Sequence, residues 1–169
     1  PVYMSYKHFH AMEICNSGSL GNGYDEINSK EYDDMLCSGK RVFAIAADDA
    51  HMRGTVDAFE SFTEIKAEKL EYKNVTDALL AGNFYSSQGP EINDLWYEDG
   101  FVHITFPPSR EAFITKGTRN AKRVKAPEGE FITEASFPIE DGDVYFRITV
   151  EAHDGKRAWT NAYFIDEIL

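Results

Sequence analysis

The sequence predicts two parts of different fold class, an α/β part followed by an antiparallel β-sandwich. Two observations support this prediction. Residues 10–89 alternate between segments with strand and helix periodicity, whereas from Pro90 onward apolar residues recur at every second position. The change of period places a boundary near Gly89-Pro90 and defines domains 1–89 and 90–169. With 43% hydrophobic residues among 169, the chain is long enough to form two small cores.

The α/β part opens with a strand, a helix and a second strand. The mostly apolar run Ala11–Cys15 predicts a buried strand. Asn28 and Glu31 have the spacing of a capping box, which predicts a helix that begins there and ends before Gly39. Six apolar residues without interruption, Val42–Ala47, are typical of a strand covered on both faces, as in a parallel sheet.

A third strand and a second helix follow in the same part. Residues 63–67 alternate between apolar and charged side chains, which predicts a half-exposed strand, and a helix then runs to Gly82. The order of elements is a βαβ arrangement, whose crossovers should be right-handed. Because three strands cannot close a barrel, we expect this part to belong to a larger fold.

The second part has the period of antiparallel strands throughout. Apolar residues alternate with polar ones in residues 102–106, 131–137 and 144–150. Asp-Gly pairs at 99–100, 141–142 and 154–155 lie between or beside these runs, where tight hairpin turns are expected. Six or seven short strands in about 80 residues indicate a sandwich.

The charge of the chain restricts its partners. A net charge of −12 argues against nucleic acid and membrane surfaces, both of which need clustered Lys and Arg. The two cysteines, Cys15 and Cys37, are interpreted as thiols with a packing role, which fits a reducing interior. Because the chain begins at Pro1 and not at a Met, the sequence leaves cytoplasmic and periplasmic locations open.

The segment Asp48-Asp49-Ala50-His51 directly follows the apolar run Val42–Ala47. At the carboxyl end of a parallel strand, side chains face the mouth of the site. The D-x-H spacing puts Asp49 and His51 on the same side, where a carboxylate oxygen and an imidazole nitrogen can share one divalent cation. The alternative to a metal site is an acidic, solvated turn between the strand and the following loop. When the D-x-H segment is considered without other motifs, this turn is the favoured interpretation.

Four segments resemble motifs of the PHP (polymerase and histidinol phosphatase) family, in family order. Residues 44–51 resemble its last metal-binding motif, and Glu13–Asn16 resemble an upstream strand that ends in Asn. Residues 78–90 resemble a helix and loop usually written A-L-x-x-G-x-F-Y-x-S-x-G-P, and residues 157–161 the closing strand of members with a C-terminal β-domain. The chain thus resembles the C-terminal half of such a protein.

The resemblance implies a fold, an activity and a set of site residues. The first part would be the last strands and helices of a (β/α)7 barrel that binds manganese, zinc or iron and hydrolyses small phosphate esters by metal-activated water. Asp49 and His51 would be metal ligands. Asp48 and Asn16 would support that site. Arg53 lies just after the D-x-H segment, where the geometry of its guanidinium suits a substrate phosphate, but a surface ion pair is the alternative that the sequence favours.

The family's other ligands lie upstream of this chain. His8 and His10 have H-x-H spacing but precede the wrong strand. We therefore expect the chain by itself to be inactive. The longer protein to which it would belong is expected to be an active metal-dependent phosphoesterase. Open strand edges predict association with itself or with the missing N-terminal half, which would bury Ala11–Cys15 and Val42–Ala47.

A non-catalytic binding module is the alternative function. In this interpretation the sandwich recognises a carbohydrate or a protein, and the first part is only its support. Trp96, Tyr97 and Trp159 are interpreted as packing residues. An exposed row of aromatic side chains on the sandwich would favour the module instead.

Overall fold

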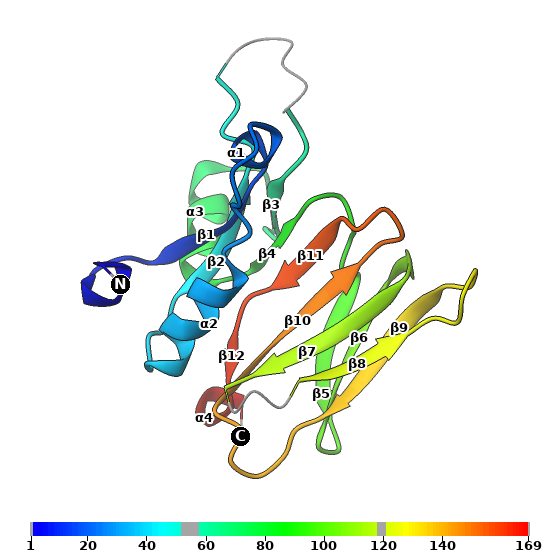
Figure 1. Cartoon of the computed structure of the whole chain (residues 1–169). Coiled ribbons are helices and arrows are strands. Elements are labelled where there is room, and N and C mark those ends of the chain that lie inside the picture. Colours follow the sequence, from blue (N-terminus) through cyan, green and yellow to red (C-terminus); the bar gives the residue numbers. More distant parts are fainter. Residues whose placement is uncertain (1, 52–57, 118–120, 169) are drawn as a thin grey trace. The chain divides into compact units, whose positions relative to one another are not determined.

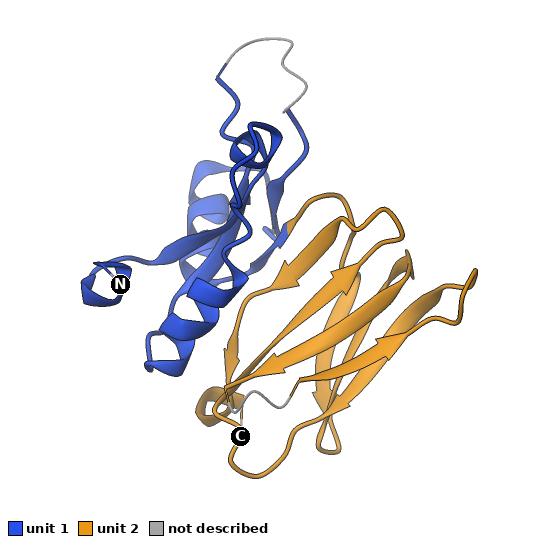
Figure 2. Ribbon diagram, viewed as in Figure 1, with its two compact units in different colours: residues 1–86 blue, residues 87–169 orange. Residues whose placement is uncertain are grey.

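The computed structural model describes residues 2–51, 58–117 and 121–168. The chain divides into two compact units, residues 1–86 and 87–169 (Figure 2). This division falls close to Gly89-Pro90, where the period of the sequence changes. Among the described residues, no helix is both long enough and apolar enough to cross a membrane.

The first unit has short helices and strands in alternation (Figure 1). They are the 3-10 helix Val2–Ser5, β1 (Ala11–Asn16), α1 (Ser17–Gly21), α2 (Ser29–Cys37), β2 (Phe43–Ala47), β3 (Phe62–Ile65), α3 (Tyr72–Ala81) and β4 (Phe84–Ser87). β1 and β2 pair in parallel, from Ala11 opposite Phe43 to Asn16 opposite Ala47. β3 and β4 are hydrogen-bonded neighbours in another sheet.

One apolar face of α2 contributes side chains to the core of the first unit. Tyr32, Met35 and Leu36 are buried, at the i, i+3, i+4 spacing of one helix face. The Tyr32 hydroxyl donates a hydrogen bond of 2.8 Å to the carbonyl of Val42, just before β2. This bond satisfies the polar end of a fully buried ring.

The prediction of a partial (β/α)7 barrel is wrong. The structure is 41% strand and 20% helix, and most of its strand pairs are antiparallel. Burial along β2 alternates, with Ala44 and Ala46 buried and Phe43, Ile45 and Ala47 only partly covered. A continuous apolar run therefore does not show that both faces are covered, because coverage depends on which elements pack against the strand. Residues 84–87, expected to be a loop, form β4.

The second unit is an antiparallel β-sandwich, as the period of two predicted. Its strands are β5 (Asp94–Glu98), β6 (Phe101–Ser109), β7 (Glu111–Lys116), β8 (Lys122–Lys125), β9 (Ile132–Pro138), β10 (Tyr145–Glu151), β11 (Arg157–Thr160) and β12 (Tyr163–Phe164), followed by α4 (Ile165–Ile168). Four strands of this unit are consecutive in one sheet, in the order β11-β10-β7-β8, with β12 also paired to β10, and a three-stranded sheet has the order β5-β6-β9.

Alternate residues of both sheets fill the core of the sandwich. Val102, Ile104, Phe106, Ala112, Ile114, Ala135, Phe137, Phe146, Ile148 and Val150 form one buried cluster. These residues come from β6, β7, β9 and β10, the strands that face each other across the two layers (Figure 1). The residues between them on β6 and β9 consequently point away from the core.

Candidate functional site

The D-x-H segment leaves β2 through a left-handed turn. Asp49 has φ 54°, a conformation that Asp adopts more readily than most residues. Its Oδ1 lies 3.7 Å from Nε2 of His51, and the two side chains are 53% and 78% exposed. The structure thus brings the two predicted ligands side by side in solvent. Among the described residues, no group of three or more His, Cys, Asp and Glu side chains is arranged to hold a metal ion.

Asp48 contacts backbone groups of two other segments. Its carboxylate accepts hydrogen bonds from the backbone N–H groups of Phe59, Glu60 and Ser61, the last two at 2.8 and 2.7 Å. Its carbonyl accepts another from Gly18 at 2.8 Å. These bonds hold residues 59–61 and the start of α1 against the end of β2.

Asn16 is the N-terminal cap of α1. Its side-chain oxygen accepts a hydrogen bond of 2.8 Å from the backbone of Ser19, and its amide donates one of 3.2 Å to Glu13. Asn16 is 7% exposed and Asp48 is partly buried, so both are held within the first unit. Their supporting roles in a metal site stay predictions. Arg53, the predicted phosphate contact, lies outside the described residues.

A small polar cluster lies beneath the Asp48 turn. The hydroxyls of Ser17 and Ser61 are hydrogen-bonded, and Cys15 Sγ lies 3.6 Å from Ser61 Oγ. Burial raises the pKa of the Cys15 thiol above its usual range. A protonated thiol without solvent access is a poor nucleophile, so this cluster has the character of core packing.

The outward face of β5-β6-β9 carries an exposed aromatic row. The hairpin register places Trp96 directly opposite His103, and His103 opposite Ser136. The rings of Trp96 and His103 stack, with centroids 5.1 Å apart and planes 17° from parallel. Phe101 lies next along β6 on the same face, 6.3 Å from the His103 ring. We call Trp96, Phe101, His103 and Ser136 the aromatic face.

The side chains of the aromatic face are exposed but held in place. Trp96 is 40% and Phe101 43% exposed, and the two side chains share one face of the sheet with His103. Nδ1 of His103 lies 2.8 Å from Ser136 Oγ, within hydrogen-bonding distance. The stacked partner on one side and the hydroxyl on the other restrict the orientation of the imidazole ring. The row is therefore a preorganised surface.

The aromatic face was missed in the sequence, although the signal was present. The sequence predicts that Trp96, Tyr97 and Trp159 are packing residues, but of these three only Trp159 is fully buried, at 1% exposure. Asp99 and Gly100 have φ 49° and 83°, as the type I′ turn of a two-residue hairpin requires. Residues equally distant from such a turn are paired, which places Trp96 opposite His103.

Comparisons with known proteins do not assign this arrangement to a family. No family model, curated protein or solved structure matches the chain. The resemblance to the PHP family stays a prediction that rests on the four sequence segments.

Proposed function

We propose that the second unit is a non-catalytic carbohydrate-binding module whose binding surface is the aromatic face. The observation that carries this proposal is the exposed Trp96 ring, stacked on His103 and followed along the sheet by Phe101. The face is built on three paired strands, so its side chains are held by regular backbone.

The chemistry of the face suits a sugar ring. One side of a pyranose presents C–H groups that pack on an aromatic ring, while its hydroxyls require hydrogen-bonding partners. Packing of these C–H groups on an aromatic ring buries apolar surface of both partners, which contributes about 25 cal/mol per Å². The Ser136 hydroxyl and the carboxylates of the same strands are the partners available for sugar hydroxyls. Because the face is already ordered, binding costs little conformational entropy.

A binding measurement tests this function directly. Electrophoresis of the whole chain in gels containing soluble polysaccharides, followed by isothermal titration with oligosaccharides, should reveal retention and a Kd. Trp96→Ala should weaken the affinity about tenfold, equivalent to ~1.4 kcal/mol, because the stacking ring is lost.

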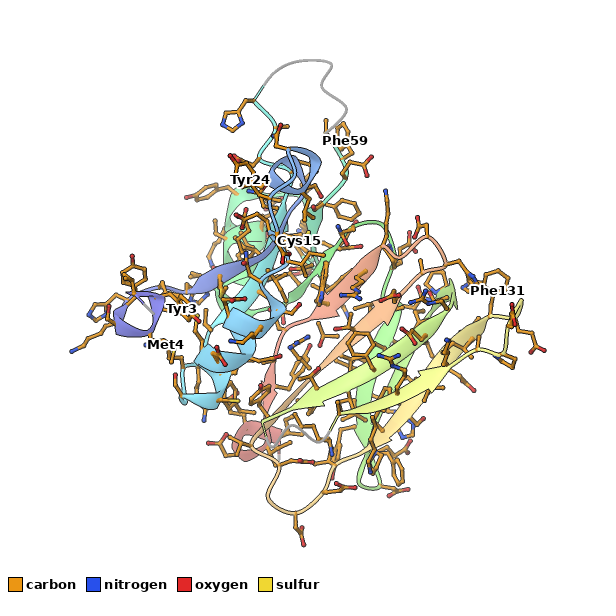
Figure 3. The ribbon with its side chains drawn as sticks, in the orientation of Figure 1. Tyr3, Met4, Cys15, Tyr24, Phe59 and Phe131 are labelled. Carbon is orange, nitrogen blue, oxygen red and sulfur yellow. The ribbon has the colours of Figure 1, made fainter. Side chains whose placement is uncertain are left out.

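Phe131→Ala provides the matched control. Phe131 is 57% exposed and also packs on a histidine, His153, at 4.5 Å, but it precedes β9 and lies outside the aromatic face (Figure 3). This variant should bind as the wild type does. Absence of binding to every polysaccharide, or equal loss in both variants, would overturn the proposal.

A second candidate function is the metal-dependent phosphoesterase that the motifs suggest, with this chain contributing part of the site. The observation that favours it is the 3.7 Å approach of Asp49 Oδ1 and His51 Nε2. In the complete protein, Asp49→Asn and His51→Ala should remove bound manganese, zinc or iron together with hydrolysis of an aryl phosphate. Full metal content and full activity in both variants would rule out this role.

The two candidates can be separated with the same variants. Asp49 and His51 belong to the first unit and do not contribute to the aromatic face. Carbohydrate binding should therefore survive Asp49→Asn and His51→Ala, and metal content should survive Trp96→Ala.

A further inference from the structure

We infer that the ligand of the aromatic face is a polymer of cationic amino sugars rather than a neutral or acidic glycan. This inference rests on the proposed function and adds the charge of the ligand to it. The three strands of the sheet, β5, β6 and β9, contain three carboxylates, Asp94, Glu98 and Glu134, and no Lys or Arg.

All three carboxylates belong to the outward side of the sheet. Asp94 is opposite Thr105, which is opposite Glu134, and Glu98 is opposite Phe101. These two rows flank the central row of Trp96, His103 and Ser136. Successive outward residues of a strand are about 7 Å apart, so acidic groups lie on both sides of the aromatic rings.

The carboxylates are available to a ligand. Asp94, Glu98 and Glu134 are exposed, and within the described part of the chain none of them forms an ion pair. Asp94 accepts one hydrogen bond, of 2.9 Å, from the backbone of Leu95. Carboxylates without basic partners attract a cation. This attraction is strongest when the opposite charges approach within a few ångströms.

The aromatic rings favour the same ligand. The face of a Trp ring attracts cations through its quadrupole, more strongly than Phe or Tyr does. A sugar that stacks on Trp96 with an ammonium group at its edge would therefore interact with both the ring and the flanking carboxylates. A uronic acid in the same position would be repelled, and a neutral sugar would gain the stacking contribution only.

Oligomers of glucosamine and N-acetylglucosamine of equal length differ in the charge of the amino group. Comparing the affinities of the two oligomers therefore measures the contribution of that charge. Both oligomers are titrated into the whole chain at a mildly acidic pH, where the free amines are protonated, at low and at high NaCl. The deacetylated oligomer should bind at least about tenfold more tightly at low salt, and this preference should shrink at high salt because the exposed charges are screened.

Variants at two of the three carboxylates test whether these groups cause that preference. Glu98→Gln and Glu134→Gln should each reduce the preference severalfold, whereas Trp96→Ala should weaken both oligomers. Glu128→Gln is the matched control, because Glu128 is an exposed carboxylate of the same unit outside the sheet. It should leave the preference unchanged.

The remaining outcomes distinguish a failure of the inference about the charge of the ligand from a failure of the proposed carbohydrate-binding module. If both oligomers bind equally and Trp96→Ala weakens both, the inference about charge is overturned and the carbohydrate module stands. If neither these nor neutral or acidic glycans bind, the module itself is overturned. Trp96-dependent binding of a lysine-rich peptide without glycan binding would overturn both claims in favour of a protein partner.

Discussion

Asp48 and Asp49 are adjacent residues of one motif, yet the structure gives their carboxylates opposite environments. The Asp48 carboxylate accepts three backbone hydrogen bonds, whereas the Asp49 side chain is 53% exposed beside His51. The difference follows from the left-handed backbone at Asp49, which turns its side chain out of the direction of β2.

Asp48→Asn should loosen residues 59–61. The amide keeps one oxygen acceptor but loses the charge and the second oxygen, which removes at least one charge-assisted bond worth about 1.5–3 kcal/mol. Hydrogen exchange at the backbone amides of Phe59, Glu60 and Ser61 should accelerate about tenfold or more. Asp49→Asn is the control, since Asn also tolerates a positive φ and the Asp49 carboxylate accepts none of these three bonds. Equal exchange rates in both variants would refute the role of the Asp48 carboxylate in holding residues 59–61.

The two cysteines should differ sharply in reactivity. Cys15, labelled in Figure 3, is completely buried and its pKa is raised by that burial, whereas Cys37 is exposed at the end of α2. In the folded protein, iodoacetamide should therefore modify Cys37 within minutes, while Cys15 reacts only after denaturant is added. Mass spectrometry of tryptic peptides measures both rates, and Cys37→Ser is the control. Rapid modification of Cys15 in the native state would contradict its burial.

Among the elements, α3 shows how one glycine positions a helix against a strand. Gly82 ends α3 with φ 75°, and its N–H bonds back to the carbonyl of Leu79. A Cβ at this position would lie 2.4 Å from Cε1 of Phe43 on β2. Glycine is thus required both by the backbone conformation and by the close approach of the ring.

Gly82→Ala should destabilise the first unit strongly. The left-handed conformation costs a non-glycine residue about 1–2 kcal/mol, and displacement of the Phe43 ring adds about 1–3 kcal/mol. Gly21→Ala is the control, because a Cβ on Gly21 meets no atom within 4 Å and its φ is not in the left-handed region. The midpoint of thermal unfolding should fall by several degrees in Gly82→Ala only. Similar midpoints in the two variants would argue against the clash.

At the scale of the whole molecule, net charge is the dominant feature. The chain carries 29 acidic and 17 basic side chains and has a formal net charge of −12. Several basic groups are committed to local pairs, such as the buried Lys116 with Asp143 and Arg157 with Glu151. The excess negative charge is consequently exposed, and it repels itself across the surface.

Salt should therefore stabilise the protein. Raising NaCl from about 0.05 M to 0.5 M shortens the range of repulsion between surface carboxylates to a few ångströms, while pairs such as Lys116 with Asp143 are screened less because they are buried. The midpoint of thermal unfolding should rise, and KCl should have the same effect. A fall in the midpoint would mean that attractive surface pairs outweigh the repulsion.

Self-association, predicted from open strand edges, stays a prediction. Within the region expected to be buried by it, Ile14, Cys15, Val42, Ala44 and Ala46 are each at most 4% exposed in the single chain already. Sedimentation velocity over a range of concentrations measures the association, and a single monomeric species throughout would contradict it.

The sequence by itself determined the features that depend on neighbouring residues. The helix face of Tyr32, Met35 and Leu36, the end of α3 at Gly82 and the antiparallel sandwich all follow from local periodicity or backbone preference. Such preferences act over a few residues, so a single segment of sequence contains the necessary information.

Only the tertiary structure decided which apolar or polar residues are covered. The apolar run Val42–Ala47 predicts a strand buried on both faces, but burial along β2 alternates because coverage depends on which elements pack against it. Likewise, Trp96 and Trp159 are the same residue type in strands, yet one is exposed in the aromatic face and the other is in the core. The physical reason is that burial is a property of pairing and packing between distant segments, which composition and period do not specify.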